Sequence, residues 1–168
     1  MVPVREPKTY SILLVDELTL VREGLAALCQ SQPHLKVSGQ CSEGAQALRI
    51  IEAQRPDIAV LDLGLTDLFA LEIVRRVREQ KLPTRIVVLS TRRDRKTVVE
   101  ALRAGVNGFL LKSGPSHQLL EAFDQVLDGG IYVSPQIELD KIFTTGQKTG
   151  PEDPIESLSA REYQVFSL

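Results

Sequence analysis

The segment Ile12-Leu13-Leu14-Val15-Asp16-Glu17 decides the fold, because four consecutive apolar residues end abruptly at two acids. Similar apolar runs occur at residues 58–61, 86–89 and 109–111. A short run that is apolar throughout is typical of a strand buried on both faces of a parallel sheet. Residues 35–41 instead alternate in character, and we expect them to form a strand near a sheet edge.

Helical spacing of apolar residues marks the segments between these runs. The segments are residues 20–28, 45–53, 68–77, 98–104 and 119–127. Each parallel strand needs a crossover connection, which a helix usually supplies. The alternation therefore predicts an α/β fold with a five-stranded, doubly wound parallel sheet and helices on both of its faces.

Composition places the chain among ordinary folded domains. Of its 168 residues, 43% are apolar and 25% are charged, which excludes a chain too polar to collapse. A formal net charge of −2 gives no general attraction to nucleic acid or to an anionic membrane. The only cysteines, Cys29 and Cys41, form no C-x-x-C pair, and no apolar run approaches the ~18 residues of a membrane helix. These features predict a cytoplasmic protein that is not bound to a membrane.

The C-terminal part of the chain changes in character. Glycine, proline and polar residues dominate 144–156, which is typical of a linker. Ser159-Ala160-Arg161-Glu162 then has the capping-box pattern that begins a helix. We expect a domain over residues 9–130, a linker over 131–156, and the start of a truncated second domain over 157–168.

Polar residues follow the apolar runs at the points where the strands should end. Asp16 and Glu17 follow the first run, Asp62 the second, Ser90 the third and Lys112 the fourth. The carboxyl ends of parallel strands lie at one edge of the sheet, where ligands gather close to the reversal of strand order. We therefore expect these five side chains to converge.

Their charges indicate a cation site. Asp16, Glu17, Asp62 and Lys112 together leave two negative charges, which one divalent ion would neutralise. Mg²⁺ fits, since it accepts carboxylates and keeps positions for water and phosphate oxygens. Lys112 and Ser90 can then bind phosphoryl oxygens, and Asp62 is the natural acceptor in a phosphoryl transfer.

Four segments of the sequence resemble a known family. Residues 12–25 (ILLVDELTLVREGL) and 101–112 (ALRAGVNGFLLK) look like the opening and the ending of a response-regulator receiver domain. Residues 129–135 (GGIYVSP) and 158–162 (LSARE) are similar to the NarL/FixJ subgroup, whose output domain is a LuxR-type helix-turn-helix. The resemblance implies a flavodoxin-like sheet of order 2-1-3-4-5 with a helical tail at the C-terminus.

The resemblance also implies roles for individual residues. Asp62 would accept a phosphoryl group from a sensor histidine kinase, and Ser90 and Lys112 would assist it. Mg²⁺ would be held by Glu17, Asp62 and the backbone carbonyl of Gly64, with Asp16 in support.

The resemblance further implies a switch and a set of partners. Ser90 and Phe109 would shift after phosphorylation and pass the signal to the output domain. Chemistry would be limited to phosphorylation and dephosphorylation of the chain itself. DNA would be bound only through the missing output domain, a homodimer could form, and no membrane partner is expected.

Several residues depart from the family pattern. Glu17 stands where Asp is common, Thr66 where Pro is usual, and Ala70 where Gly is usual. Leu18 and Thr19 replace a common His-Pro pair. The charged groups are kept, but the loops beside them differ.

Two other functions are compatible with parts of the pattern. The altered loop, residues 64–70, supports a receiver-like binding module that works without phosphorylation. A phosphatase of the haloacid dehalogenase type combines a similar set of groups, but it needs a general-acid Asp two residues after its nucleophile. Gly64 occupies that place, which disfavours the phosphatase.

Overall fold

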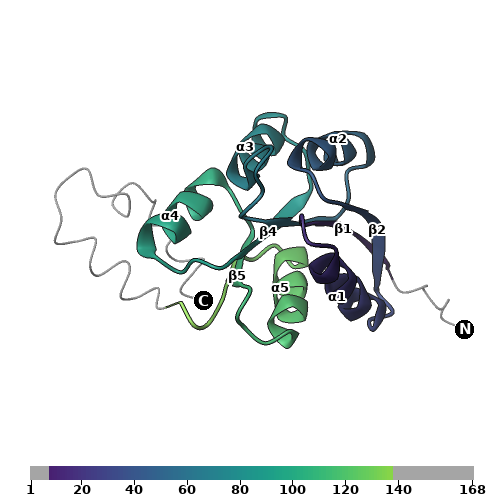
Figure 1. The fold of residues 1–168 in the computed structure, drawn as a ribbon. Coiled ribbons are helices and arrows are strands. Elements are labelled where there is room, and N and C mark those ends of the chain that lie inside the picture. The colour runs from purple at the N-terminus through teal and green to yellow at the C-terminus, as the bar shows by residue number, and fades with distance from the viewer. Residues whose placement is uncertain (1–7, 138–168) are drawn as a thin grey trace, which may run out of the picture.

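Strands and helices alternate along the part of the chain that the computed structural model describes, residues 8–137 (Figure 1). Its strands are β1 (Tyr10–Val15), β2 (Leu35–Cys41), β3 (Ile58–Asp62), β4 (Arg85–Ser90), β5 (Gly108–Leu111) and β6 (Tyr132–Val133). Its helices are α1 (Thr19–Gln30), α2 (Gly44–Gln54), α3 (Ala70–Glu79), α4 (Arg95–Ala104) and α5 (His117–Leu127). The predicted linker at 144–156 and the helix beginning at Ser159 lie outside the described residues.

All strands pair in parallel, in the order β2-β1-β3-β4-β5-β6. The predicted α/β class and the order 2-1-3-4-5 are confirmed, with β2 at one edge as expected. The sequence order reverses at β1, which lies between β2 and β3. The carboxyl ends of β1 and β3 therefore form the switch point at which such sheets bind ligands.

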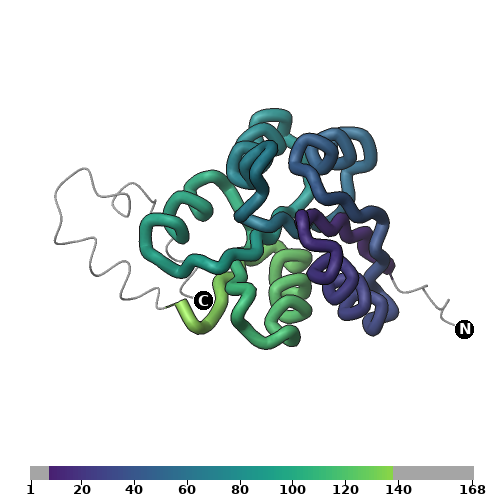
Figure 2. The backbone as a smooth tube through the Cα atoms, in the orientation of Figure 1, coloured from purple at the N-terminus to yellow at the C-terminus, as the bar shows by residue number. Residues whose placement is uncertain are grey.

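Side chains of β1 alternate between the two faces of the sheet. Leu13 and Val15 pack with residues of α2, α3 and α4, whereas Ile12 and Leu14 pack with residues of α1 and α5. Figure 1 shows α2 and α3 on one face of the sheet and α1 and α5 on the other. All four side chains are almost completely buried, as expected of a strand covered by helices on both sides. Figure 2 shows that α1 and α5, far apart in sequence, lie side by side on the second face.

The sixth strand, β6, was not expected from the sequence, which predicted five strands. It is two residues long and pairs with β5, and Ser134 beyond it accepts a hydrogen bond from the Leu111 amide on Oγ at 2.8 Å. Ile137 is also buried against the core. These residues lie in the segment assigned to the linker, so the division at residue 130 stays a prediction.

Helix α4 begins before the apolar spacing that predicts it. Residues 98–104 were expected from apolar spacing, but the helix begins at Arg95 because Asp94 caps it and accepts a hydrogen bond from the Thr97 amide at 3.1 Å. No helix in the described range has the length and apolar character that crossing a membrane requires.

Arg78 joins three segments near the amino ends of β4 and β5. Its guanidinium donates hydrogen bonds to the carbonyls of Gly105 and Thr84, both at 3.0 Å, and to the side-chain oxygen of Asn107. Burial, with a smaller contribution from Arg85, lowers the pKa of Arg78. Arg78 thus connects the end of α3 to the segments that precede β4 and β5.

We expect Arg78→Met to lower the free energy of unfolding by about 2–3 kcal/mol, because three partly buried oxygens lose a charged donor. Urea unfolding followed by circular dichroism measures this change. Arg76→Met, on the same helix but with an exposed pair to Glu72, is the matched control and should cost less than about 0.5 kcal/mol. Equal effects of the two substitutions would contradict this role of Arg78.

The β3–α3 loop, residues 63–69, is attached to the start of α2. The Asp67 carboxylate accepts hydrogen bonds from the amides of Gly44 at 2.8 Å and Ala45 at 3.0 Å. Donation by Ala45 and then Gly44 lowers the pKa of Asp67. A Cβ on Gly44 would lie 2.5 Å from the Leu68 carbonyl oxygen, so only glycine permits this close approach.

Asp67→Ala should lower stability at pH 7 by at most about 1 kcal/mol, since it removes an exposed helix cap. The folded pKa of Asp67 lies below its unfolded value. Its contribution is therefore present above the unfolded pKa of about 4 and is lost as pH falls through the folded value. Unfolding curves of the wild type and the variant should converge between about pH 5 and pH 2, and a gap independent of pH would refute this interpretation.

Candidate functional site

Lys112, Asp16 and Asp62 meet at the carboxyl end of the sheet. The Lys112 ammonium lies 3.0 Å from Asp16 Oδ2 and 2.9 Å from Asp62 Oδ1. Asp16 immediately follows β1, Asp62 ends β3, and Lys112 follows β5. The sheet thus brings together side chains 96 residues apart in the sequence, as the strand-end argument predicted.

Burial makes this cluster unusual. The Asp16 side chain is 0% exposed, while those of Asp62 and Lys112 are 13% and 21% exposed. Asp16 is held in place by the Leu18 amide, which donates to its Oδ1 at 2.9 Å. Burial by itself lowers the pKa of Lys112, but hydrogen bonds and charge from Asp62 and Asp16 outweigh it, so the pKa is raised. The lysine therefore remains an ammonium ion at neutral pH.

Asp62 is the carboxylate that a reactant can reach. The Gly64 amide donates to its Oδ1 at 3.0 Å, and Lys112 contacts that same oxygen. Neither contact uses Oδ2. A Cβ on Gly64 would lie 3.5 Å from both Asp62 oxygens, so the loop backbone passes directly beside this carboxylate.

Ser90 lies beside this cluster, at the end of β4. Its carbonyl accepts a hydrogen bond from the Lys112 amide at 2.8 Å. Its hydroxyl, however, is engaged with Arg92: it donates to the Arg92 carbonyl at 2.8 Å and accepts from the Arg92 amide at 2.9 Å. Phe109, on β5, is fully buried in the core between the sheet and α4.

Glu17 is predicted to join this cluster but instead contacts Thr66. Its Oε1 accepts hydrogen bonds from the Thr66 amide at 2.9 Å and the Thr66 hydroxyl at 2.6 Å. Within residues 8–137, no three His, Cys, Asp or Glu side chains are grouped so that they could hold a metal ion. Since Asp16 and Asp62 share Lys112, Glu17 is the acid missing from such a group. Thr66 departs from the family pattern, but no signal in the sequence indicates that it contacts Glu17.

The donor set fits a hard divalent cation in its chemistry. Carboxylates are the ligands that Mg²⁺ prefers, and two of them, those of Asp16 and Asp62, contact the Lys112 ammonium here. Gly64 lies close enough to Asp62 for its backbone to join them. The fit is completed only if Glu17 turns from Thr66 toward the cluster.

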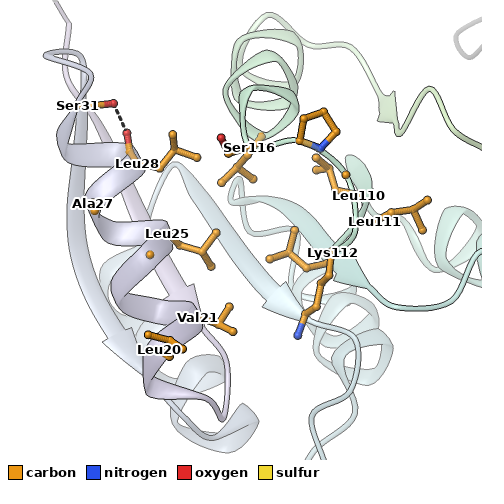
Figure 3. A pocket seen from close by; sticks show the side chains of 15 residues that line it. Leu20, Val21, Leu25, Ala27, Leu28, Ser31, Leu110, Leu111, Lys112 and Ser116 are labelled. Atoms are coloured by element: carbon orange, nitrogen blue, oxygen red, sulfur yellow. Dashed lines mark hydrogen bonds between the residues drawn. The ribbon is translucent and has the colours of Figure 1, made fainter.

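An open apolar groove between α1 and α5 runs beside the site, and Lys112 lies at its edge (Figure 3). Side chains such as Leu20, Leu25 and Leu119 line it, and Leu20 is 82% exposed. The groove offers few polar groups, so the chemistry belongs to the strand-end cluster.

The known proteins that this chain resembles are response regulators. The family model of the response regulator receiver domain matches residues 12–124. The nitrate/nitrite response regulator protein NarL of Escherichia coli is 32% identical over 98% of this chain and 76% of its own length. Among solved structures, a LuxR-family two-component response regulator from Aurantimonas has a TM-score of 0.76 at 29% identity, covering 82% of this chain and 98% of its own.

A second solved structure supports the same assignment. The signal receiver domain of a NarL response regulator from Mycobacterium tuberculosis has a TM-score of 0.71 at 30% identity, and the match covers 73% of this chain and 99% of that one. Together with the strand order and the cluster at the switch point, these matches establish the family. The chain belongs to the response regulator receiver family, in the NarL/LuxR type of two-component regulators.

Proposed function

We propose that Asp62 is the phosphoryl acceptor of this receiver and that a sensor histidine kinase is the donor. The observation that carries the proposal is the contact of Lys112 with both Asp16 and Asp62 at the switch point of the sheet. This arrangement holds one partly exposed carboxylate beside a fixed positive charge. Phosphoryl transfer depends mainly on such positioning and charge stabilisation.

The reaction is a displacement at phosphorus. An oxygen of Asp62 forms the new P–O bond while the P–N bond of the kinase phosphohistidine breaks. The leaving imidazole nitrogen keeps the electron pair and takes a proton from water. Lys112 then stabilises the added negative charge, because its ammonium already lies 2.9 Å from Asp62 Oδ1.

The proposed ligands of Mg²⁺ are Asp16, Glu17, Asp62 and the Gly64 carbonyl. When bound, Mg²⁺ would supply positive charge to the phosphoryl oxygens. Asp16 is suited to a supporting role because its side chain is fully buried and shares Lys112 with Asp62. Glu17 is exposed and has to leave Thr66 to take part.

Ser90 and Phe109 are the proposed switch. The Ser90 hydroxyl would have to exchange its Arg92 backbone contacts for a phosphoryl oxygen. This exchange would move the segment that leads into α4. Residues of α4 pack in the same core cluster as the buried Phe109. A dianionic group can bias two arrangements of such a surface.

The similarity to NarL/LuxR relatives supports a proposed role in the regulation of transcription. Phosphorylation would regulate transcription through a DNA-binding output domain, in the cytoplasm, with a homodimer as one form of the protein. The chain would act on itself and would not turn over a separate substrate. The start of that output domain, assigned to 157–168, lies outside the described residues.

One observation favours a second candidate, a receiver that signals without phosphorylation. Glu17 is engaged by Thr66, and the negative charge of Asp16 and Asp62 is partly neutralised by Lys112. A receiver with these contacts could bind its partner without being phosphorylated. Phosphorylation itself distinguishes the two candidates.

With Mg²⁺ and acetyl phosphate, intact-protein mass spectrometry should detect one added phosphoryl group on the wild type, and Asp62→Asn should abolish it. Asp128→Asn, which changes an exposed acid just after α5, is the matched control and should be phosphorylated normally. An adduct that persists in Asp62→Asn would show that the acceptor is a different residue. If neither acetyl phosphate nor a kinase gave an adduct, the second candidate would replace the first.

Lys112→Met should lower the free energy of unfolding without metal by about 3 kcal/mol, because it leaves the fully buried Asp16 without its cation. Urea unfolding in EDTA measures the change. Lys96→Met, at an exposed position of α4, should have little effect. A loss below about 1 kcal/mol would mean that solvent reaches Asp16 and that Lys112 does not stabilise it.

A further inference from the structure

The contact between Glu17 and Thr66 has the geometry of a strong hydrogen bond. One carboxylate oxygen, Glu17 Oε1, receives both the hydroxyl proton at 2.6 Å and the amide proton at 2.9 Å from Thr66. The first distance is that of a charge-assisted O–H···O⁻ bond. We call this pair of hydrogen bonds the Glu17–Thr66 latch.

Contacts of the two residues that follow Thr66 also hold it in place. The next residue, Asp67, is bound to the amides of Gly44 and Ala45, and Leu68 lies against Gly44 so closely that no side chain fits there. The loop is therefore attached to α2 independently of Glu17. If Glu17 moves toward Asp16 and Asp62, Thr66 cannot follow it without breaking these contacts.

We propose that the latch competes with the divalent cation for Glu17, so that Thr66 sets the metal affinity of the site. This inference rests on the proposed function, in which Glu17 is a metal ligand. In the latched form Glu17 lies outside the cluster of Asp16 and Asp62, and no metal-binding group is assembled within residues 8–137. Binding of the cation then has to break the latch, and the cost of breaking it weakens the measured affinity.

The proposal predicts the effect of removing the Thr66 hydroxyl. Thr66→Val keeps the shape of the side chain and the amide donor but loses the 2.6 Å hydrogen bond. It should bind Mg²⁺ about 3- to 10-fold more tightly than the wild type, the size of one net hydrogen bond. Thr66→Ser keeps a hydroxyl and should bind as the wild type does. Isothermal titration calorimetry with Mg²⁺ on the full chain gives these affinities.

Thr97→Val is a matched control. Thr97 also donates its hydroxyl, at 2.9 Å, and its amide, at 3.1 Å, to one oxygen of a carboxylate, that of Asp94 at the start of α4. The Thr97→Val variant tests whether the loss of any threonine–carboxylate hydrogen bond changes Mg²⁺ binding. Its Mg²⁺ affinity should equal that of the wild type.

Thermal unfolding provides a second measurement that needs no phosphorylation. Without metal, Thr66→Val should melt below the wild type, because it loses part of the latch. At saturating Mg²⁺ the two should melt together, because the latch is already broken in the bound wild type. Thr97→Val should melt below the wild type by the same amount in both conditions.

Three results would overturn the proposal. Thr66→Val with wild-type or weaker Mg²⁺ affinity would show that the latch does not oppose binding. A difference in melting temperature that persists at saturating Mg²⁺ would show that the latch survives in the bound state. Absence of Mg²⁺ binding to every form, the wild type included, would refute both this inference and the metal site of the proposed function, whereas the first two results leave that function intact.

Discussion

The site depends on one ammonium ion placed between two carboxylates. Lys112 reaches Asp16 and Asp62 only because β1, β3 and β5 run parallel and end at the same edge of the sheet. Asp16 is completely buried, and an isolated carboxylate in such a place would be strongly destabilising without its cation. The lysine thus stabilises the fold and prepares the charge distribution of the site. These two functions cannot be changed separately by substituting Lys112.

Much of this arrangement could be predicted from the sequence, because its signals are local. Four apolar runs ending in polar residues indicate parallel buried strands, and the rule that such strands end at one edge brings Asp16, Asp62 and Lys112 together. The expected place of Ser90, at the end of the next strand, is also correct. Roles assigned from family resemblance, such as the metal ligands and the switch pair, stay predictions.

The features that could not be predicted depend on contacts between distant segments. Glu17 turns to Thr66 because the loop after β3 is held against α2, and no periodic pattern records that approach. Strand β6 is two residues long and is defined by its pairing with β5, so it is too short for alternation to reveal it. Arg78 is an ordinary charged residue of an amphipathic helix until the fold brings Gly105 and Asn107 to it.

The two edges of the sheet carry a consequence for self-association. An uncovered edge strand offers unpaired amides and carbonyls as a template for a second chain, which leads to aggregation. Here β6 offers a very short edge, and β2 alternates exposed Lys36, Ser38 and Gln40 with more buried residues. A lysine on an edge strand opposes stacking of like strands. Within residues 8–137, growth of the sheet from one copy into the next is therefore disfavoured at β2 and at β6.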